Sequence, residues 1–176
     1  MIEQIEIEPI HPEELEELAD LAARTFRDAF GWSLTQDELD KFLAETRSVA
    51  YFEKSLLRST ILVAKHGDRI VGYVQFGSVK IPEVDVATDD MELSRIYVDT
   101  GLQRQGIGRQ LMDAALSDPK MELAPNIYLQ VWEENPTAIS LYENYGFVKC
   151  GVTTFDLGGI PAQDLIMVRH QLQASQ

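Results

Sequence analysis

A short stretch of the chain, QRQGIGR at residues 103–109, combines residue types suited to binding a phosphate group. It follows an apolar run and precedes a run with helical spacing, so it lies where a helix begins. The first N–H groups of a helix have no partner within the helix and carry the positive end of its dipole. Gly106 and Gly108 leave room for an anion to approach, and Arg104 and Arg109 add positive charge. The alternative is a plain turn that happens to contain two glycines.

The segments on either side of this turn predict a buried strand and an amphipathic helix. The segment ELSRIYV at 92–98 ends in aliphatic, β-branched and aromatic residues, which favour a strand. Asp99, Thr100 and Gly101 interrupt that pattern. Beyond the turn, apolar residues at i, i+4 spacing form one stripe: Ile107, Leu111, Met112, Ala115 and Leu116.

The turn matches neither of two familiar phosphate-binding motifs, because it lacks the first glycine of the dinucleotide fingerprint and the Gly-Lys-Ser/Thr of a P-loop. Gln103-x-x-Gly106-x-Gly108, after a strand ending Ile96-Tyr97-Val98, instead resembles the acetyl-CoA signature of the GCN5-related N-acetyltransferases (GNAT). The stretches 131–138 (VWEENPTA) and 141–147 (LYENYGF) resemble that family's strand, Asn, helix, Tyr and Gly-Phe sequence. The resemblance covers most of the chain. It is strongest to the bacterial spermidine/spermine-type (PaiA-like) acetyltransferases.

The resemblance implies that acetyl-CoA is the co-substrate and that no metal is needed. It implies that backbone N–H groups of Ile96, Tyr97 and Val98 meet the acetyl carbonyl and the pantetheine amides. It also implies that the Asn135 side chain holds pantetheine, although a simple helix N-cap is the other interpretation of this residue. The turn residues expected to contact acetyl-CoA are Gln103, Arg104, Gln105, Gly106, Ile107, Gly108 and Arg109.

Acetyl transfer from a thioester to an amine needs a proton acceptor, a donor facing the oxyanion and an acid for the leaving thiolate. Tyr142 is the candidate acid. It lies about two helical turns beyond Asn135, and the resemblance places a tyrosine here to protonate the thiolate of coenzyme A. The alternative is a core aromatic side chain packed on Leu141 or Tyr145.

Glu92 is the candidate base. The strand period places it on one face with Ser94, where a carboxylate could accept the amine's proton through a water molecule. The alternative is a solvated acid at the end of the strand, beside Asp89 and Asp90. The resemblance does not decide between these two interpretations.

The pattern of apolar residues predicts the order β-α-α-β-β-β-α-β-α-β-β within a single domain spanning residues 1–176. This order predicts an α/β (α+β) fold with a mixed, largely antiparallel sheet of about seven strands and helices on both faces. The resemblance implies the same fold, with parallel fourth and fifth strands that splay around pantetheine. Local signals predict a capping box at Thr35 and Glu38, a loop between Pro119 and Pro125, and a final hairpin around Gly158-Gly159.

Composition limits the function. Lys and Arg total 15 and Asp and Glu total 29, so the formal net charge is −14. This charge argues against a nucleic-acid partner and favours cationic small molecules, although acidity can also serve solubility alone. The single cysteine, Cys150, is expected to be a strand residue. No run of about 20 apolar residues predicts a membrane helix, and the N-terminal residues are acidic rather than basic, unlike a signal peptide. We therefore expect a cytoplasmic protein with no membrane partner, and a homodimer remains possible.

The acceptor is less well determined than the donor. The resemblance and the acidic loop residues Glu83, Asp85, Asp89 and Asp90 favour a polyamine or another small cationic amine as the substrate. A RimI-like peptide or protein N-terminal acetyltransferase is the alternative within the family. A non-catalytic acyl-CoA-binding sensor is the alternative outside enzymes.

Overall fold

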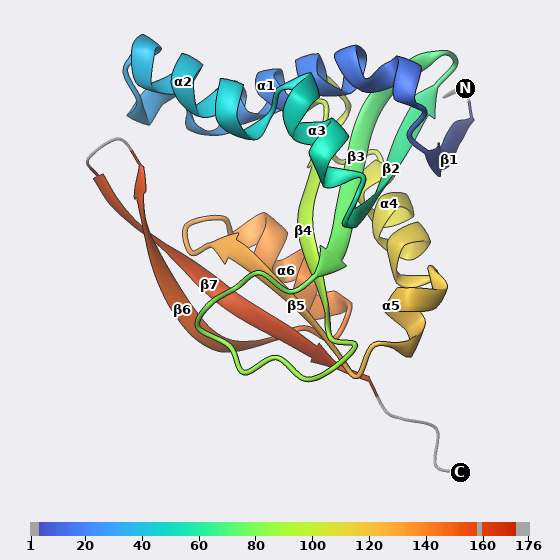
Figure 1. Cartoon of the computed structure of the whole chain (residues 1–176), viewed down its shortest axis with the longest axis vertical. Coiled ribbons are helices and arrows are strands. Elements are labelled where there is room, and N and C mark those ends of the chain that lie inside the picture. The colour runs from blue at the N-terminus through green and yellow to red at the C-terminus, as the bar shows by residue number, and fades with distance from the viewer. Residues whose placement is uncertain (1–3, 158–159, 172–176) are drawn as a thin grey trace. The chain divides into compact units, whose positions relative to one another are not determined.

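The computed structural model describes residues 4–157 and 160–171 and contains one seven-stranded mixed sheet (Figure 1). The strand order is β1-β2-β3-β4-β5-β7-β6. β4 (Met91–Val98) runs parallel to β5 (Asn126–Trp132). The pairs β1 with β2, β5 with β7 and β6 with β7 are antiparallel. The predicted mixed, largely antiparallel sheet with parallel fourth and fifth strands is therefore confirmed.

The chain forms two compact units. The first unit contains the residues up to Phe76 together with Arg95–Leu116, and the second contains Gly77–Ser94 and the residues from Ser117 onward. The unit boundaries fall within β3 and β4, so each of these strands supplies residues to both units. Within the part of the chain that the structure describes, no helix is long and apolar enough to cross a membrane.

The first unit contains β1, β2, most of β3, the C-terminal half of β4 and helices α1 to α4. Every helix and strand predicted for this part of the chain is present. The bounds are β1 Ile5–Pro9, η1 Pro12–Glu14, α1 Leu15–Phe30, η2 Gly31–Ser33, α2 Gln36–Thr46, α3 Val49–Ser55, β2 Ser59–His66, β3 Arg69–Ser78, η3 Thr100–Leu102 and α4 Ile107–Leu116.

The predicted capping box opens α2. The Thr35 hydroxyl accepts from the Glu38 N–H at 3.3 Å, and the Glu38 carboxylate accepts from the Thr35 N–H at 2.9 Å. These two bonds satisfy N–H groups that have no partner inside the helix. The hydrogen bonds to Thr35 also hold the pKa of Glu38 below its usual value.

The core of the first unit lies where α1 and α3 cover β2 and β3. The apolar face of α1 is buried with Phe52 of α3 and with Ile61 and Val63 of β2. On β3, Tyr73 packs edge to face against Phe52, with ring centroids 6.0 Å apart. The preceding residue, Gly72, points to the opposite face of the strand, where α4 packs (Figure 1). Helices therefore cover both faces of these strands.

The second unit contains the remaining strands and two helices, and one prediction for it is wrong. The segment expected to be a loop between Pro119 and Pro125 forms the short helix α5 (Pro119–Leu123). The Asp118 side chain accepts from the Lys120 N–H at 2.9 Å, and Pro119 occupies the first turn, where its missing N–H costs nothing. The other elements are α6 Pro136–Asn144, β6 Val148–Leu157 and β7 Ile160–His170.

The predicted final hairpin is present as β6 and β7, while its expected turn at Gly158-Gly159 lies outside the described residues. The register of β6 against β7 shifts between Lys149 and Gly151. Cys150 lies at this irregularity and is exposed. Its predicted position in a strand is confirmed.

Among the glycines of the first unit, Gly72 has the closest surroundings, and the sequence did not single it out. A Cβ atom on Gly72 would lie 3.0 Å from the carbonyl oxygen of Tyr97 and 3.2 Å from a methyl group of Leu111. β3, β4 and α4 therefore approach one another more closely here than a side chain would allow. The missing side chain sets the separation of these three elements.

We expect Gly72→Val to lower the free energy of unfolding by about 2–3 kcal/mol, because the new side chain would force backbone atoms apart. Gly31→Ala is the matched control. Gly31 has ordinary helical backbone angles, and an added Cβ would make contacts of 3.8 Å. The control should be neutral or slightly stabilising. Denaturant unfolding of both variants measures the difference, and equal stability would contradict the close-packing argument.

Candidate active site

The turn at 103–109 has the geometry expected of an anion-binding loop. Arg104 and Gly106 both have left-handed backbone angles, with φ of 63° and 83°. The Gln110 N–H donates to the Gly106 carbonyl at 3.1 Å, which marks the first turn of α4. Helix geometry leaves the N–H groups just before Gln110 without a carbonyl inside the helix. Concave runs of backbone N–H groups with such angles attract anions.

The two glycines of the turn serve different purposes. Gly106 permits the left-handed angle, which a side chain would strain. A Cβ added at Gly106 would meet no atom within 4 Å, and one added at Gly108 would only touch Val98 at 4.0 Å. Protein packing therefore does not require either glycine. The space beside them is open, and their role in holding a phosphate remains a prediction.

The carboxylate of Asp99, which precedes the turn, is already neutralised by two arginines. One oxygen of Asp99 accepts hydrogen bonds from Arg24 and Arg69, each at 3.0 Å. The other accepts from the Gly101 N–H at 3.2 Å and caps η3. The Gln103 side-chain amide donates to the Val98 carbonyl at 3.5 Å, which links the turn to β4. Arg104 and Arg109 extend the positive charge along the turn.

Of the predicted site residues, Ile96, Tyr97, Val98 and those of the turn lie in the first unit. Asn135, Tyr142 and Glu92 lie in the second. Asn135 is the N-cap of α6, and its side-chain oxygen accepts from the Ala138 N–H at 3.1 Å. The side-chain amide nitrogen is not engaged in this capping bond. The capping interpretation is confirmed, and a role in holding pantetheine remains a prediction.

Tyr142 is buried, with 6% of its surface exposed. Its ring packs against Phe147 at a centroid distance of 6.0 Å. Its carbonyl accepts from the N–H groups of Tyr145 and Phe147, and Gly146 completes this helix end with φ of 86°. These hydrogen bonds at the C-terminus of α6 fix the backbone position of Tyr142.

Glu92 is not the solvated acid of the alternative interpretation. Only 8% of its surface is exposed, and its carboxylate accepts from the Lys80 N–H at 2.6 Å. Burial raises the pKa of Glu92, although the Lys80 N–H and ammonium oppose the shift. A carboxyl group with a raised pKa is better matched to proton transfer near neutral pH than an exposed one.

The acidic loop at 80–90 offers less free charge than its composition predicts. Asp90 is buried and accepts from the backbone N–H groups of Ala87 and Asn126 and from the Asn126 side chain. Glu83 accepts from the Thr153 hydroxyl at 2.6 Å. Two of the four acids proposed to attract a polycation therefore have structural bonds within the second unit.

A further carboxylate, Asp164 on β7, was not predicted as a site residue. It lies opposite Trp132 in the register of β5 with β7, and burial raises its pKa to about 6. An acid in an otherwise apolar strand, QDLIMV, was the available sequence signal. Asp164 is a second candidate proton acceptor in the same unit as Glu92.

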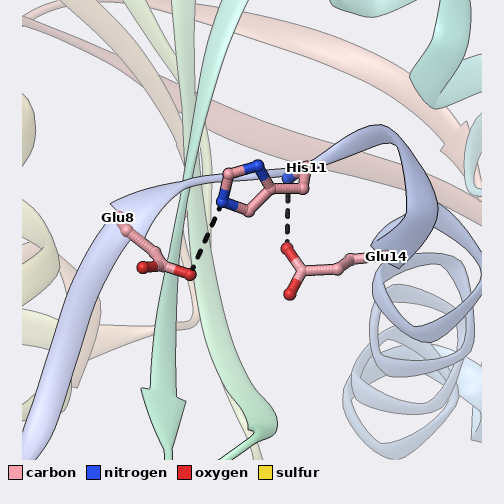
Figure 2. A group of neighbouring side chains, drawn as sticks. All are labelled: Glu8, His11 and Glu14. Atoms are coloured by element: carbon pink, nitrogen blue, oxygen red, sulfur yellow. Dashed lines mark hydrogen bonds and ion pairs between the residues drawn. The ribbon is translucent and has the colours of Figure 1, made fainter.

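Among the residues that the structure describes, one group of side chains could hold a metal ion, and a lysine ammonium already bonds to its two carboxylates. The possible ligand atoms of Glu8, His11 and Glu14 all lie within 4.8 Å of one another (Figure 2). The Lys65 ammonium bonds to both carboxylates, and these bonds raise the pKa of Lys65 well above its usual value. The ammonium supplies the positive charge that a metal ion would bring, so the cluster serves to fasten β2 to β1 and η1.

The comparisons with known proteins agree with this geometry. The model of the acetyltransferase (GNAT) family matches residues 15–147. The chain belongs to this family. An uncharacterized N-acetyltransferase of Mycobacterium tuberculosis is 32% identical over 157 residues, which cover 88% of this chain and 96% of the relative. The ribosomal protein bS18-alanine N-acetyltransferase of Escherichia coli is 37% identical over 62 residues, 35% of this chain and 42% of the relative.

Solved structures show the same fold. The PaiA N-acetyltransferase of Thermoplasma acidophilum, solved with coenzyme A, has a TM-score of 0.76 at 20% identity and covers 96% of this chain and 99% of its own. A protein of Pyrococcus horikoshii has a TM-score of 0.69 at 25% identity and covers 97% of this chain and 100% of its own. As a GNAT family member, the protein is an N-acetyltransferase that takes its acetyl group from acetyl-CoA.

The open space at Gly108 gives the sharpest test of the cradle. We expect Gly108→Val to weaken coenzyme A binding by at least about tenfold, because its side chain would occupy the space expected for phosphate. Gly106→Val is less informative, because positive φ strains any side chain there.

Calorimetry with coenzyme A measures the effect. Gly101→Val in the neighbouring turn is the control, since a Cβ there makes ordinary contact with Asp99 at 3.8 Å. Equal affinity in Gly108→Val and the control would remove the cradle interpretation.

Proposed function

We propose that the protein transfers the acetyl group directly from acetyl-CoA to the primary amine of a small molecule. The observation that supports this most is the open, positively charged turn at 103–109. Its backbone angles suit an anion, and a Cβ atom added at Gly106 or Gly108 would meet no protein atom closer than 4.0 Å. A sensor that binds acyl-CoA without chemistry needs the same turn. The buried carboxylate of Glu92 favours the enzyme, because a sensor has no use for a tuned proton acceptor.

In the proposed reaction, bound acetyl-CoA supplies a thioester carbonyl that the neutral amine attacks. A C–N bond forms and the C–S bond breaks. Glu92 accepts the amine's proton through a water molecule, and the Tyr142 hydroxyl gives its proton to the departing thiolate. Backbone N–H groups of Ile96 to Val98 hold the acetyl carbonyl. The proton on Glu92 then passes through water to restore Tyr142, so one proton moves in total from amine to thiol.

We expected the acetyl acceptor to be a polyamine. The acidic residues of the 80–90 loop, in the second unit, support this expectation only in part. Of the four acids of the loop, Asp90 is buried and bonded, while Glu83, Asp85 and Asp89 are exposed and Glu83 already accepts from Thr153. We therefore propose a small primary amine, without requiring a polycation. Peptide N-terminal acetylation, the activity named for the E. coli relative, is the second candidate.

Tyr142→Phe removes only a hydroxyl group. We expect kcat to fall about 10–10³-fold while affinity for acetyl-CoA is nearly kept, because the acid acts only as the thiolate departs. Tyr145→Phe, three residues further along, is the control and should behave as wild type. Free-thiol release in steady-state kinetics measures both. Wild-type turnover in Tyr142→Phe would show that water protonates the thiolate.

Glu92→Gln should change the pH profile. Since burial raises the pKa of Glu92, the ionised base is lost as pH falls through that raised value. The wild-type kcat/KM should therefore fall on the acid side in part because Glu92 becomes protonated, and the variant should lose this component. Its overall rate should fall about 10²–10⁴-fold. The glutamine oxygen can still accept from Lys80, so the loop bond is retained.

The control is Glu122→Gln, an exposed acid of α5. An unchanged pH profile in Glu92→Gln would assign the base elsewhere, with Asp164 the next residue to test.

A further inference from the structure

Two arginines lie near each other in the first unit without a carboxylate partner. Arg47, the C-cap of α2, has 6% of its surface exposed, and its guanidinium lies 4.3 Å from the ring centroid of Phe26. Arg95 of β4 lies 4.5 Å above the ring of Tyr51. Burial lowers the pKa of Arg47, and the nearby charge of Arg95 lowers it further.

The bonds that these guanidiniums make are all to neutral groups. Arg47 Nη1 donates to the Thr46 hydroxyl at 2.8 Å, and Arg95 Nη1 donates to the Thr46 carbonyl at 2.8 Å. Among the ion pairs of the described residues, none involves Arg47 or Arg95. A buried charge without a counter-ion is costly and needs an explanation.

Two buried polar atoms of this cluster, and a third two residues further along β3, have no hydrogen bond within the described part of the chain. They are Arg47 Nε, the Tyr73 hydroxyl and Gln75 Oε1. Tyr73 and Gln75 are two residues apart on β3 and share one face of the strand. Burial raises the pKa of Tyr73 to about 12, although Arg95 and Arg47 act against this shift. The hydroxyl therefore stays protonated, and its hydrogen remains available for donation even where its oxygen faces the Arg95 guanidinium.

Unsatisfied groups of this kind are uncommon in folded proteins. Two guanidiniums and a phenol offer an excess of donors and of positive charge. A carboxylate would satisfy both deficits, because its two oxygens match the planar fork of Nε–H and Nη–H, and its charge offsets the pair.

We propose that Arg47, Arg95 and Tyr73 bind a carboxylate group of the acceptor, so the substrate is an amino acid-like amine rather than a polycation. This inference rests on the proposed acetyl transfer. Tyr97 connects the proposed carboxylate site with the proposed acetyl transfer. Its ring stacks on Tyr73 with centroids 5.8 Å apart, and its ring centroid lies 5.9 Å from the Arg47 guanidinium. Its backbone is the part of β4 expected to hold the acetyl group. A second ammonium on the substrate would meet two like charges here.

Matched amines that differ only at the end remote from the amine test the proposal. 5-Aminopentanoate, 5-aminopentanamide and 1,5-diaminopentane present a carboxylate, a neutral amide and an ammonium on the same carbon chain. The series of ω-amino acids from glycine to 6-aminohexanoate covers other distances between the amine and the carboxylate. The common α-amino acids cover amines beside the carboxylate, and each compound is compared with its amide. We expect the best carboxylate to exceed its amide in kcat/KM by at least about tenfold, and the diamine to be poorer still.

Arg47→Gln should remove that preference, chiefly through KM, while Arg47→Lys should restore it only in part because lysine lacks the planar fork. Tyr73→Phe deletes one donor without removing charge and should reduce the preference less. Arg27→Gln is the control: this half-exposed arginine of α1 lies 3.6 Å from Asp40 and should leave the preference unchanged. Retained coenzyme A affinity in each variant shows that the protein is folded.

Calorimetry of the same amines with coenzyme A present separates the two proposals. Acetylation and binding that both favour carboxylates and depend on Arg47 support both. Carboxylate binding that depends on Arg47, with no amine acetylated, supports the site and overturns the proposed acetyl transfer. Faster acetylation of the amides, the diamines or peptide N-termini keeps the transfer and overturns the carboxylate site. The carboxylate site is also overturned if Arg47→Gln leaves the preference for carboxylates intact, or if no carboxylate binds.

Discussion

The close approach of backbone at Gly72 is the constraint on which the first unit depends. A side chain at this position would collide with the carbonyl oxygen of Tyr97 at 3.0 Å and with Leu111 of α4. Because β3 and β4 are so close here, Tyr97 can stack on Tyr73 one residue along β3. The same contact seats α4, and the turn at 103–109 precedes that helix directly. A single absent side chain thus sets the positions of the expected phosphate turn and the aromatic cluster together.

Burial changes the chemistry of several ionisable groups in each unit. In the second unit, burial raises the pKa values of Glu92 and Asp164, the two proposed proton acceptors. In the first, burial and the nearby charge of Arg95 lower the pKa of Arg47, which no described acid offsets. Lys65 is the useful contrast, since its ammonium forms ion pairs with both Glu8 and Glu14. Lys65 is thus offset by carboxylates, whereas Arg47 and Arg95 form no ion pair among the described residues.

Much of the fold could be predicted because it depends on local signals. The period of apolar residues marks α1 and α4, and short capping motifs mark α2 and α6. The loop expected between Pro119 and Pro125 is helical because the Asp118 cap outweighs what two prolines indicate when considered alone. Tertiary properties could not be read in the same way. The burial of Glu92 and Asp90 depends on partners 12 and 36 residues away in the chain, and the packing at Gly72 joins three separate elements.

The net charge of −14 illustrates why composition is a poor guide to the acceptor. Exposed charges are screened by salt beyond about 10 Å, whereas buried ones act on a ligand through a medium of lower polarity. Most acids of the helices and of the 80–90 loop are exposed, and Asp90 is buried but fully bonded. A ligand beside Tyr97 would therefore respond mainly to Arg47 and Arg95, which are few but close and uncompensated. The overall acidity favours the approach of cations to the surface, while the buried charges of the first unit select for an anionic group.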